Sequence, residues 1–139
     1  MKENDDKKSA EAFIARDRFA REMGIQLVSV SPGRATARLK ITEAHHNGLG
    51  MTQGGAVFTL ADLAFAAASN SHGTAAVAIN ASISFLKATA GGVLTAEAEE
   101  ITANPKLSTY TVRVTDDTGE VVAIFQGMAY RKKQPLVPE

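Results

Sequence analysis

The spacing of apolar and polar residues predicts both strands and helices along this chain. Residues 33–41 alternate strictly, with alanine, leucine or isoleucine at every second position and basic residues or threonine between them, the pattern of a half-buried strand. Together with residues 25–31 this run predicts a hairpin around Pro32-Gly33. Upstream, the apolar residues of 11–24 are spaced like one face of a short helix that ends at Gly24.

The middle of the chain predicts one long helix, and the second half predicts a sheet. Residues 55–69 are apolar almost throughout and carry a single charge, Asp62. Turn residues then separate four strand-like runs, at 76–88, 93–103, 106–116 and 120–132. Because the links between these runs are short, we expect a meander of antiparallel strands, with the long helix across the apolar face of the sheet.

The length of 139 residues suits one domain. We expect this domain to cover residues 11–133, with a disordered tail at 1–10 and a loose tail at 134–139. Apolar residues make up 45% and charged residues 22%, which is typical of a folded soluble protein. No stretch resembles a signal peptide or a membrane span, so we expect a cytoplasmic protein.

Charge and cysteine content exclude several classes of function. Fifteen basic residues balance fifteen acidic ones, so no overall field favours nucleic acid or an anionic membrane as a partner. The chain contains no cysteine, which excludes disulfides, a thiolate nucleophile and a cysteine-based metal site.

A helical wheel divides the residues of 55–69 between two faces. One face, wholly apolar and suited to the sheet, holds Val57, Leu60, Ala64 and Ala67. The opposite stripe mixes large apolar and small polar residues: Gly55, Phe58, Thr59, Asp62, Phe65, Ala66 and Ser69. Such a stripe requires a second surface to cover it.

Asp62 has two interpretations. It lies in the middle of the helix, where burying an unpaired charge is costly. In the structural interpretation, Asp62 forms an ion pair with an arginine or lysine from another element. In the functional interpretation, it is a carboxylate in an apolar cleft, which tends to have a raised pKa and to act as a base or nucleophile.

The glycine-rich stretch before the helix, GLGMTQGG at 48–55, differs in spacing from a dinucleotide-binding loop and lacks the Lys-Ser/Thr of a P-loop. The N–H groups of Gly54 and Gly55 could instead donate to an oxygen that develops negative charge. Alternatively, the two glycines only permit a tight turn. Gly54 and Asp62 are about 12 Å apart along one helix, so one small reacting group could use both only across a two-fold dimer.

The combination of these motifs resembles the hotdog-fold acyl-CoA thioesterases of the phenylacetic acid degradation type. The similarity covers about residues 20–133 and includes FLKA at 85–88; its signature runs from Asn47 and Gly50 through Gln53-Gly54-Gly55 and Asp62 to ASNSHG at 68–73. It implies an α+β hotdog fold, in which an antiparallel β-sheet wraps around one long central α-helix. It also implies homodimers, often paired into tetramers, and hydrolysis of a coenzyme A thioester, phenylacetyl-CoA-like or a short or medium acyl-CoA, without a metal or other cofactor.

The resemblance also implies roles for individual residues. The Gly54 N–H polarises the thioester carbonyl, Asp62 of the neighbouring protomer is the general base or nucleophile, and Asn47 positions water or the carbonyl. Substrate contacts are expected from Gln53, Gly55, Phe58, Phe65, Asn70, Lys87, Lys106 and Arg131. Many relatives carry histidine at position 53; because glutamine cannot carry a proton near neutral pH, we interpret Gln53 as a residue that orients the loop.

Two alternative functions stay open. A hotdog acyl-thioester dehydratase would normally need a histidine paired with a carboxylate, which Gln53 disfavours. An acyl-CoA binding or regulatory module would keep the pocket without turnover. His45, His46 and His72 lack the spacing of a metal site, so we predict polar loop roles for them and no metal.

Overall fold

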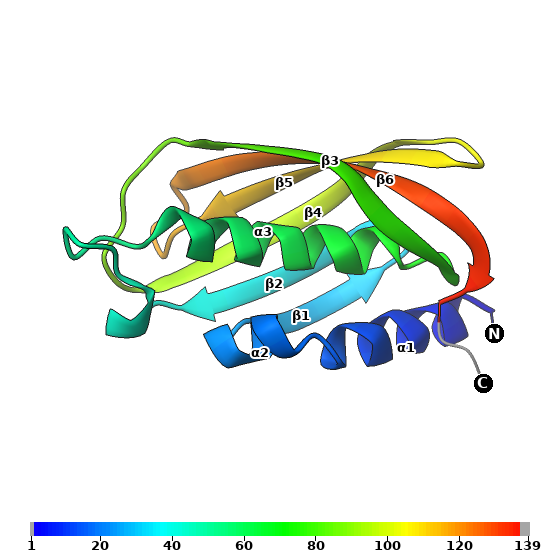
Figure 1. Ribbon diagram of the computed structural model, residues 1–139, viewed down its shortest axis with the longest axis horizontal. Coiled ribbons are helices and arrows are strands. Elements are labelled where there is room, and N and C mark those ends of the chain that lie inside the picture. Colours follow the sequence, from blue (N-terminus) through cyan, green and yellow to red (C-terminus); the bar gives the residue numbers. More distant parts are fainter. Residues whose placement is uncertain (1, 137–139) are drawn as a thin grey trace.

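The computed structural model describes residues 2–136 as an α+β structure built on one antiparallel sheet (Figure 1). Its helices are α1 (Lys2–Ala15), α2 (Arg18–Met23), the short 3-10 helix η1 (Glu43–His45) and α3 (Gly54–Ser69). Its strands are β1 (Gln26–Ser31), β2 (Arg34–Lys40), β3 (Thr74–Phe85), β4 (Val93–Ala103), β5 (Leu107–Thr115) and β6 (Val121–Pro135). The predicted hairpin, the long central helix and the later strands are therefore confirmed.

The six strands form a single sheet in the order β1-β2-β4-β5-β6-β3, with every neighbouring pair antiparallel. One expectation was wrong: β3 does not pair with β4, and the meander consists of β4, β5 and β6 alone. Instead β3 pairs with β6 along most of its length and forms an edge of the sheet. The segment 86–92 therefore crosses from β3, at the edge of the sheet, to β4, which is not its neighbour. Because this segment is short, the sequence suggested that the two strands pair with each other.

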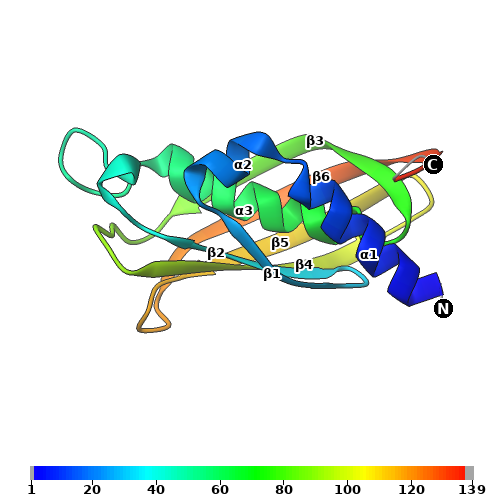
Figure 2. The same ribbon diagram turned by 90° about the horizontal axis from the view of Figure 1, so that it is seen from below.

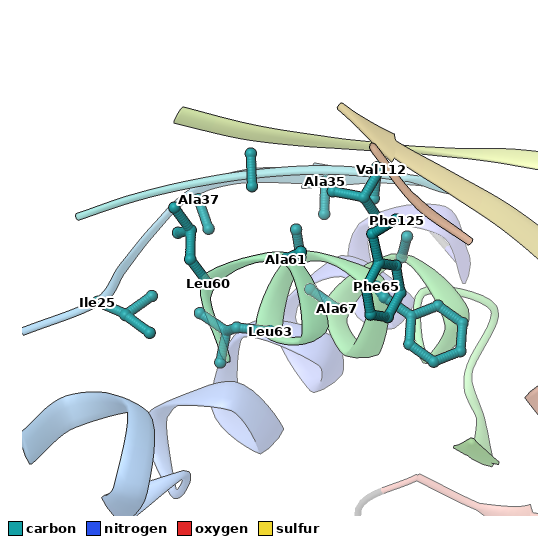
Figure 3. Close-up of a cluster of buried hydrophobic side chains, with 14 of the residues drawn as sticks. Ile25, Ala35, Ala37, Leu60, Ala61, Leu63, Phe65, Ala67, Val112 and Phe125 are labelled. Atoms are coloured by element: carbon teal, nitrogen blue, oxygen red, sulfur yellow. The ribbon is translucent and has the colours of Figure 1, made fainter. Parts of the chain in front are cut away.

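Helix α3 lies across the inner face of the curved sheet (Figure 1). Small residues on both surfaces let them approach closely: Ala61, Ala64 and Ala67 of α3 and Ala37 of β2 are all completely buried. Larger side chains fill the remaining space, as Figure 3 shows for Leu60 and Phe65. The predicted sheet-facing side of the helix is confirmed, because its four members are all buried.

The N-terminal region corrects two expectations. Residues 2–10, expected to be disordered, belong to α1, and Ala10 and Ile14 of this helix are buried. The single helix expected over 11–24 is broken into two, because the side chain of Asp17 accepts a hydrogen bond of 3.0 Å from the N–H of Ala20 and so begins α2. Helices α1 and α2 lie alongside β1 and α3 (Figure 2).

The C-terminal strand is longer than predicted. Strand β6 continues to Pro135, and Leu136 is buried, with its N–H donating to the carbonyl of Gly73 at 3.1 Å. Residues 134–136 of the expected loose tail therefore belong to the fold, and residues 137–139 lie outside the described part of the chain. Within residues 2–136, no helix combines the length and the apolar character needed to cross a membrane.

Candidate active site

The first turn of α3 leaves one backbone donor unused. Gln53 is the N-cap, and its side-chain carbonyl accepts a hydrogen bond from the N–H of Gly55. The N–H groups of Ala56 and Val57 donate to the backbone carbonyl of Gln53 at 2.9 and 3.4 Å. Among residues 2–136, no hydrogen bond uses the N–H of Gly54. This donor, at the positive end of the helix dipole, can bind an oxygen that carries or develops negative charge.

These bonds refine the expectations for this loop. Gly55 cannot offer its N–H to a ligand without losing its bond to Gln53, so of the two glycines only Gly54 fits the predicted donor role. Gln53 holds the start of the helix, as its interpretation as a loop-orienting residue requires. The cap uses a side-chain oxygen, which glutamine provides, so position 53 does not need a histidine for this role.

Asn47 organises the loop that precedes the helix. Its side-chain oxygen accepts hydrogen bonds from the N–H groups of Leu49 at 2.8 Å and Met51 at 3.1 Å. Within the described chain, the Nδ2 group of Asn47 has no hydrogen-bond partner. It can therefore donate to a ligand, as the prediction for this residue requires.

A cleft of about 520 Å³ joins these groups. Asn47 and Gly54 line it together with Phe85, Leu86 and Lys87 from the end of β3 and the segment after it. The ring of Phe85 lies against Gly54, where an added β-carbon would be 3.2 Å from its Cζ atom. The cleft thus brings two of the predicted catalytic residues onto an apolar surface with one lysine beside it.

Asp62 lies outside this cleft. It is half-buried on α3, two turns after Gly54, and none of the ion pairs formed within residues 2–136 includes it. Burial, and secondly the negative charge of Asp17, raise the pKa of Asp62 above the usual 3.8 of aspartate. The structural interpretation, an ion pair with a basic residue of another element, therefore finds no support within the chain.

Sequence reasoning missed the contribution of Asp17. An aspartate immediately before a short helical run is a recognisable N-cap signal. Its effect on Asp62 could not be read from the sequence, because it depends on α2 lying beside α3.

Two aromatic residues expected to contact the substrate belong to the core. Phe65 is 2% exposed and packs against Tyr110 and Phe125, with ring centroids 5.6 Å away in both cases. Its ring also covers Gly127, where an added β-carbon would lie only 2.7 Å from Cε1. Phe58 is half-buried, with its ring 5.4 Å from that of Phe125. The helical wheel placed both residues on the stripe opposite the sheet-facing side, but their rings pack against aromatic residues of the sheet.

Asn70, also expected to contact the substrate, has a structural role instead. It is 2% exposed, and its Nδ2 group donates to the carbonyls of Ala66 at 2.9 Å and Ala76 at 3.3 Å. Its Oδ1 atom accepts from the N–H of Ala76 at 2.8 Å. Asn70 thus connects the end of α3 to the start of β3, and its polar atoms are already engaged.

The three basic residues predicted to bind coenzyme A are not together. Lys87 lies beside the cleft and forms ion pairs with Asp116 at 2.5 Å and Glu120 at 2.9 Å, and the hydrogen bonds that its Nζ group donates to these carboxylates raise its pKa. Lys106 and Arg131 lie at the opposite end of the sheet, where the N–H of Arg131 donates to the carbonyl of Lys106. Neither lines the cleft in the same chain.

The histidines have the polar loop roles predicted for them. His45 is buried, with Nε2 2.6 Å from the carbonyl of Met23 and Nδ1 accepting from the N–H of Thr42 at 2.9 Å. His46 lies 2.7 Å from the carbonyl of Ala90. His72 contacts Glu100 at 3.0 Å at the far end of α3.

Residues 49–123 match the thioesterase superfamily. The acyl-coenzyme A thioesterase PaaI of Escherichia coli strain K12 is 36% identical over 124 residues, which cover 88% of this chain and 89% of that protein. The 1,4-dihydroxy-2-naphthoyl-CoA hydrolase of Listeria monocytogenes is 29% identical over 116 residues, covering 81% and 94%. A solved structure of the E. coli PaaI protein, from the phenylacetic acid degradation operon, has a TM-score of 0.91 at 32% identity and covers 97% of this chain and 99% of that one.

Proposed function

Because this chain belongs to the thioesterase superfamily and is an acyl-CoA thioesterase, we propose that two copies of it build each active site. The reaction is hydrolysis of the thioester to a free acid and coenzyme A. The observation that carries the proposal concerns residues 2–136, among which the Gly54 N–H in the cleft donates no hydrogen bond and the Asp62 carboxylate, two helical turns away, forms no ion pair.

One copy alone does not bring these groups to the same atom. Eight residues separate Gly54 from Asp62, which corresponds to about 12 Å along a helix. In a two-fold dimer with antiparallel α3 helices, Gly54 of one protomer faces Asp62 of the other, and the symmetry generates two identical sites. The uncovered stripe of α3, with Gly55, Thr59 and Asp62, then also has a partner.

The edge strand β3 supports such a dimer. It pairs with β6 on one side only, and its apolar side chains Val77 and Ile79 are 43% and 54% exposed. An edge strand of this length with exposed apolar residues is a surface on which a second chain can pair. Antiparallel pairing of two β3 strands about a two-fold axis would extend the sheet through both protomers. A dimer, or a dimer of dimers, is the expected state in solution.

We assign the chemical steps as follows. The thioester carbonyl oxygen accepts from the Gly54 N–H and from Nδ2 of Asn47. Asp62 of the partner removes a proton from water, whose oxygen attacks the carbonyl carbon. The carbon–sulfur bond then breaks, and the thiolate of coenzyme A leaves and takes up a proton. If Asp62 attacks directly, an anhydride forms and water hydrolyses it in a second step.

The raised pKa of Asp62 fits this role, because a base works best when its pKa approaches the working pH. The negatively charged carrier would meet Lys87 beside the cleft. Antiparallel pairing also brings the start of one β3 beside the end of the other, so Lys106 and Arg131 of the partner could contact the carrier. We predict no metal or cofactor requirement and a cytoplasmic location.

A thiol-release assay over aryl, short and medium acyl-CoAs tests this function. We expect turnover of at least one class, with simple esters of the same acids much poorer because they lack the carrier. Saturable binding without thiol release would favour the binding module. Equal rates on an ester and its acyl-CoA would show that no carrier site exists.

A further inference from the structure

The loop before α3 contains an asparagine followed directly by a glycine, Asn47-Gly48. Asparagine is a thermolabile residue, because the backbone nitrogen of the next residue can attack its side-chain amide. Glycine in that next position leaves the nitrogen unhindered, since it has no β-carbon. The chain has five asparagines, and Asn47 is the only one that precedes a glycine. It is also the asparagine that lines the cleft with Gly54.

The structure leaves the attacking nitrogen of this pair accessible. Gly48 is exposed, and a β-carbon built on it would meet nothing within 4 Å. Among residues 2–136, no hydrogen bond uses the N–H of Gly48. Neither packing nor a hydrogen bond to another described residue therefore protects this nitrogen.

The side chain of Asn47 is activated for such an attack. Its Oδ1 atom accepts hydrogen bonds from the N–H groups of Leu49 at 2.8 Å and Met51 at 3.1 Å. Attack on Cγ places negative charge on Oδ1, and two N–H donors stabilise this oxyanion. The leaving group is free as well, because Nδ2 has no hydrogen-bond partner within the described chain. The loop thus supplies the nucleophile, the oxyanion donors and an unrestrained leaving group.

We propose that Asn47-Gly48 is a deamidation site that limits the active life of this enzyme. Hydroxide removes the proton of the Gly48 nitrogen, which forms a bond to Cγ of Asn47. The bond from Cγ to Nδ2 breaks, and Nδ2 takes a proton from water and leaves as ammonia. Water then opens the resulting succinimide at either carbonyl, which leaves aspartate or isoaspartate at position 47.

The effect on activity rests on the proposed function, in which Nδ2 of Asn47 donates to the thioester carbonyl. Both products replace this donor with a carboxylate, which at neutral pH only accepts hydrogen bonds. The carboxylate also places a negative charge beside an oxygen that itself develops negative charge. Modified sites should therefore be inactive, and the enzyme should lose activity in proportion to the modified fraction.

Another asparagine provides an internal control. Asn104 also accepts two backbone hydrogen bonds through Oδ1, from the N–H groups of Lys106 at 3.0 Å and Leu107 at 2.7 Å. It is followed by Pro105, whose nitrogen carries no hydrogen and cannot form the succinimide in this way. Asn104 should therefore keep its amide, although its side-chain oxygen is bonded like that of Asn47.

The test incubates the full-length protein in neutral and in mildly alkaline buffer and measures peptide masses and thiol release over time. Deamidation raises the mass of a peptide by about one dalton. We expect this gain in the peptide that contains Asn47, faster in alkaline buffer, and not in the peptide that contains Asn104. The variant Gly48→Ala hinders the attacking nitrogen, and the open space around Gly48 admits the added β-carbon. It should gain mass several-fold more slowly and keep its own starting activity for longer.

The outcomes separate this proposal from the proposed function. If Asn47 gains mass no faster than Asn104, or if Gly48→Ala gains mass as fast as wild type, the deamidation site is wrong. If Asn47 is modified while thiol release stays constant, its modification does not limit the active life and the proposal is overturned. If wild type releases no thiol from any acyl-CoA at the start, the proposed function fails, and the peptide masses still test the deamidation site.

Discussion

Replacing Gly54 with proline removes one N–H group and keeps the start of α3. Gly54 is the first residue of the helix, a position where the fixed φ and missing N–H of proline are tolerated. Gln53 before it has φ −68° and ψ 136°, the extended conformation that a residue preceding proline prefers. The cap between Gln53 and Gly55 can therefore remain in the variant.

The steric effect of this substitution can be controlled. A β-carbon at position 54 would lie 3.2 Å from Cζ and 3.4 Å from Cε1 of Phe85. These contacts are tight, but the Phe85 ring is 55% exposed and can shift. Gly54→Ala introduces the same β-carbon and keeps the N–H, so it is the matched control.

The loss of one oxyanion donor typically lowers kcat by about 10²–10³-fold. We expect this loss for Gly54→Pro in a thiol-release assay, and a much smaller change for Gly54→Ala. Melting curves should show that both variants remain folded. If the two variants lose activity equally, the β-carbon and not the N–H is responsible; if Gly54→Pro keeps wild-type kcat, the N–H has no catalytic role.

Three further substitutions test the other assignments. Asp62→Asn should lower turnover by at least about 10²-fold. Because the pKa of Asp62 is raised in the fold, ionisation of this carboxylate destabilises the fold as pH rises above 3.8, the usual pKa of aspartate. Asp62→Asn should therefore have the same melting temperature as wild type at lower pH and an equal or higher melting temperature near pH 7. A large drop in melting temperature at pH 7 would instead reveal a cationic partner of Asp62. Asp17→Asn keeps the helix cap and removes a charge that raises the pKa of Asp62. The acid limb of the profile of kcat/KM against pH should therefore move to lower pH. An unchanged acid limb would contradict the electrostatic coupling between Asp17 and Asp62. Asn70→Ala leaves the buried N–H of Ala76 without its acceptor and should lower the free energy of unfolding by about 1–3 kcal/mol in a denaturant titration; an unchanged stability with a raised KM would return Asn70 to the substrate site.

Local patterns predicted the elements of this fold well. Strict alternation identified β2, and the long apolar run identified α3 to within one residue of its start. Both patterns reflect a side-chain period set by the backbone, so they need no information about distant residues. The partner of β3 could not be predicted in this way, because pairing with β6 depends on contacts about fifty residues away in sequence.

The site was predicted in part. The glycine pair and Asp62 drew attention to helix α3, at whose start the N–H of Gly54 donates no hydrogen bond among residues 2–136, and the span between them led to the prediction of a second copy. The sequence could not tell that the Gln53 side chain already uses the N–H of Gly55, nor that the ring of Phe65 reaches Gly127. Both facts depend on side-chain conformations in the folded state. The first part of α1, residues 2–10, was missed because it is mostly polar and buries only Ala10.

The central claim is that each site combines Gly54 of one protomer with Asp62 of another. Two inactive variants, Gly54→Pro and Asp62→Asn, can test it by complementation. In a mixed dimer, one site receives both substitutions and the other receives neither, so half of its sites are intact.

The decisive measurement is the thiol-release rate of the two variants co-expressed in equal amounts, compared with each variant alone. Random pairing makes half of the dimers mixed, so we predict recovery of about a quarter of the wild-type activity per protomer. Recovery should disappear when the two proteins are purified separately and assayed before their subunits can exchange. If the co-expressed mixture contains mixed dimers and is no more active than the single variants, both groups act within one chain and the shared site is wrong.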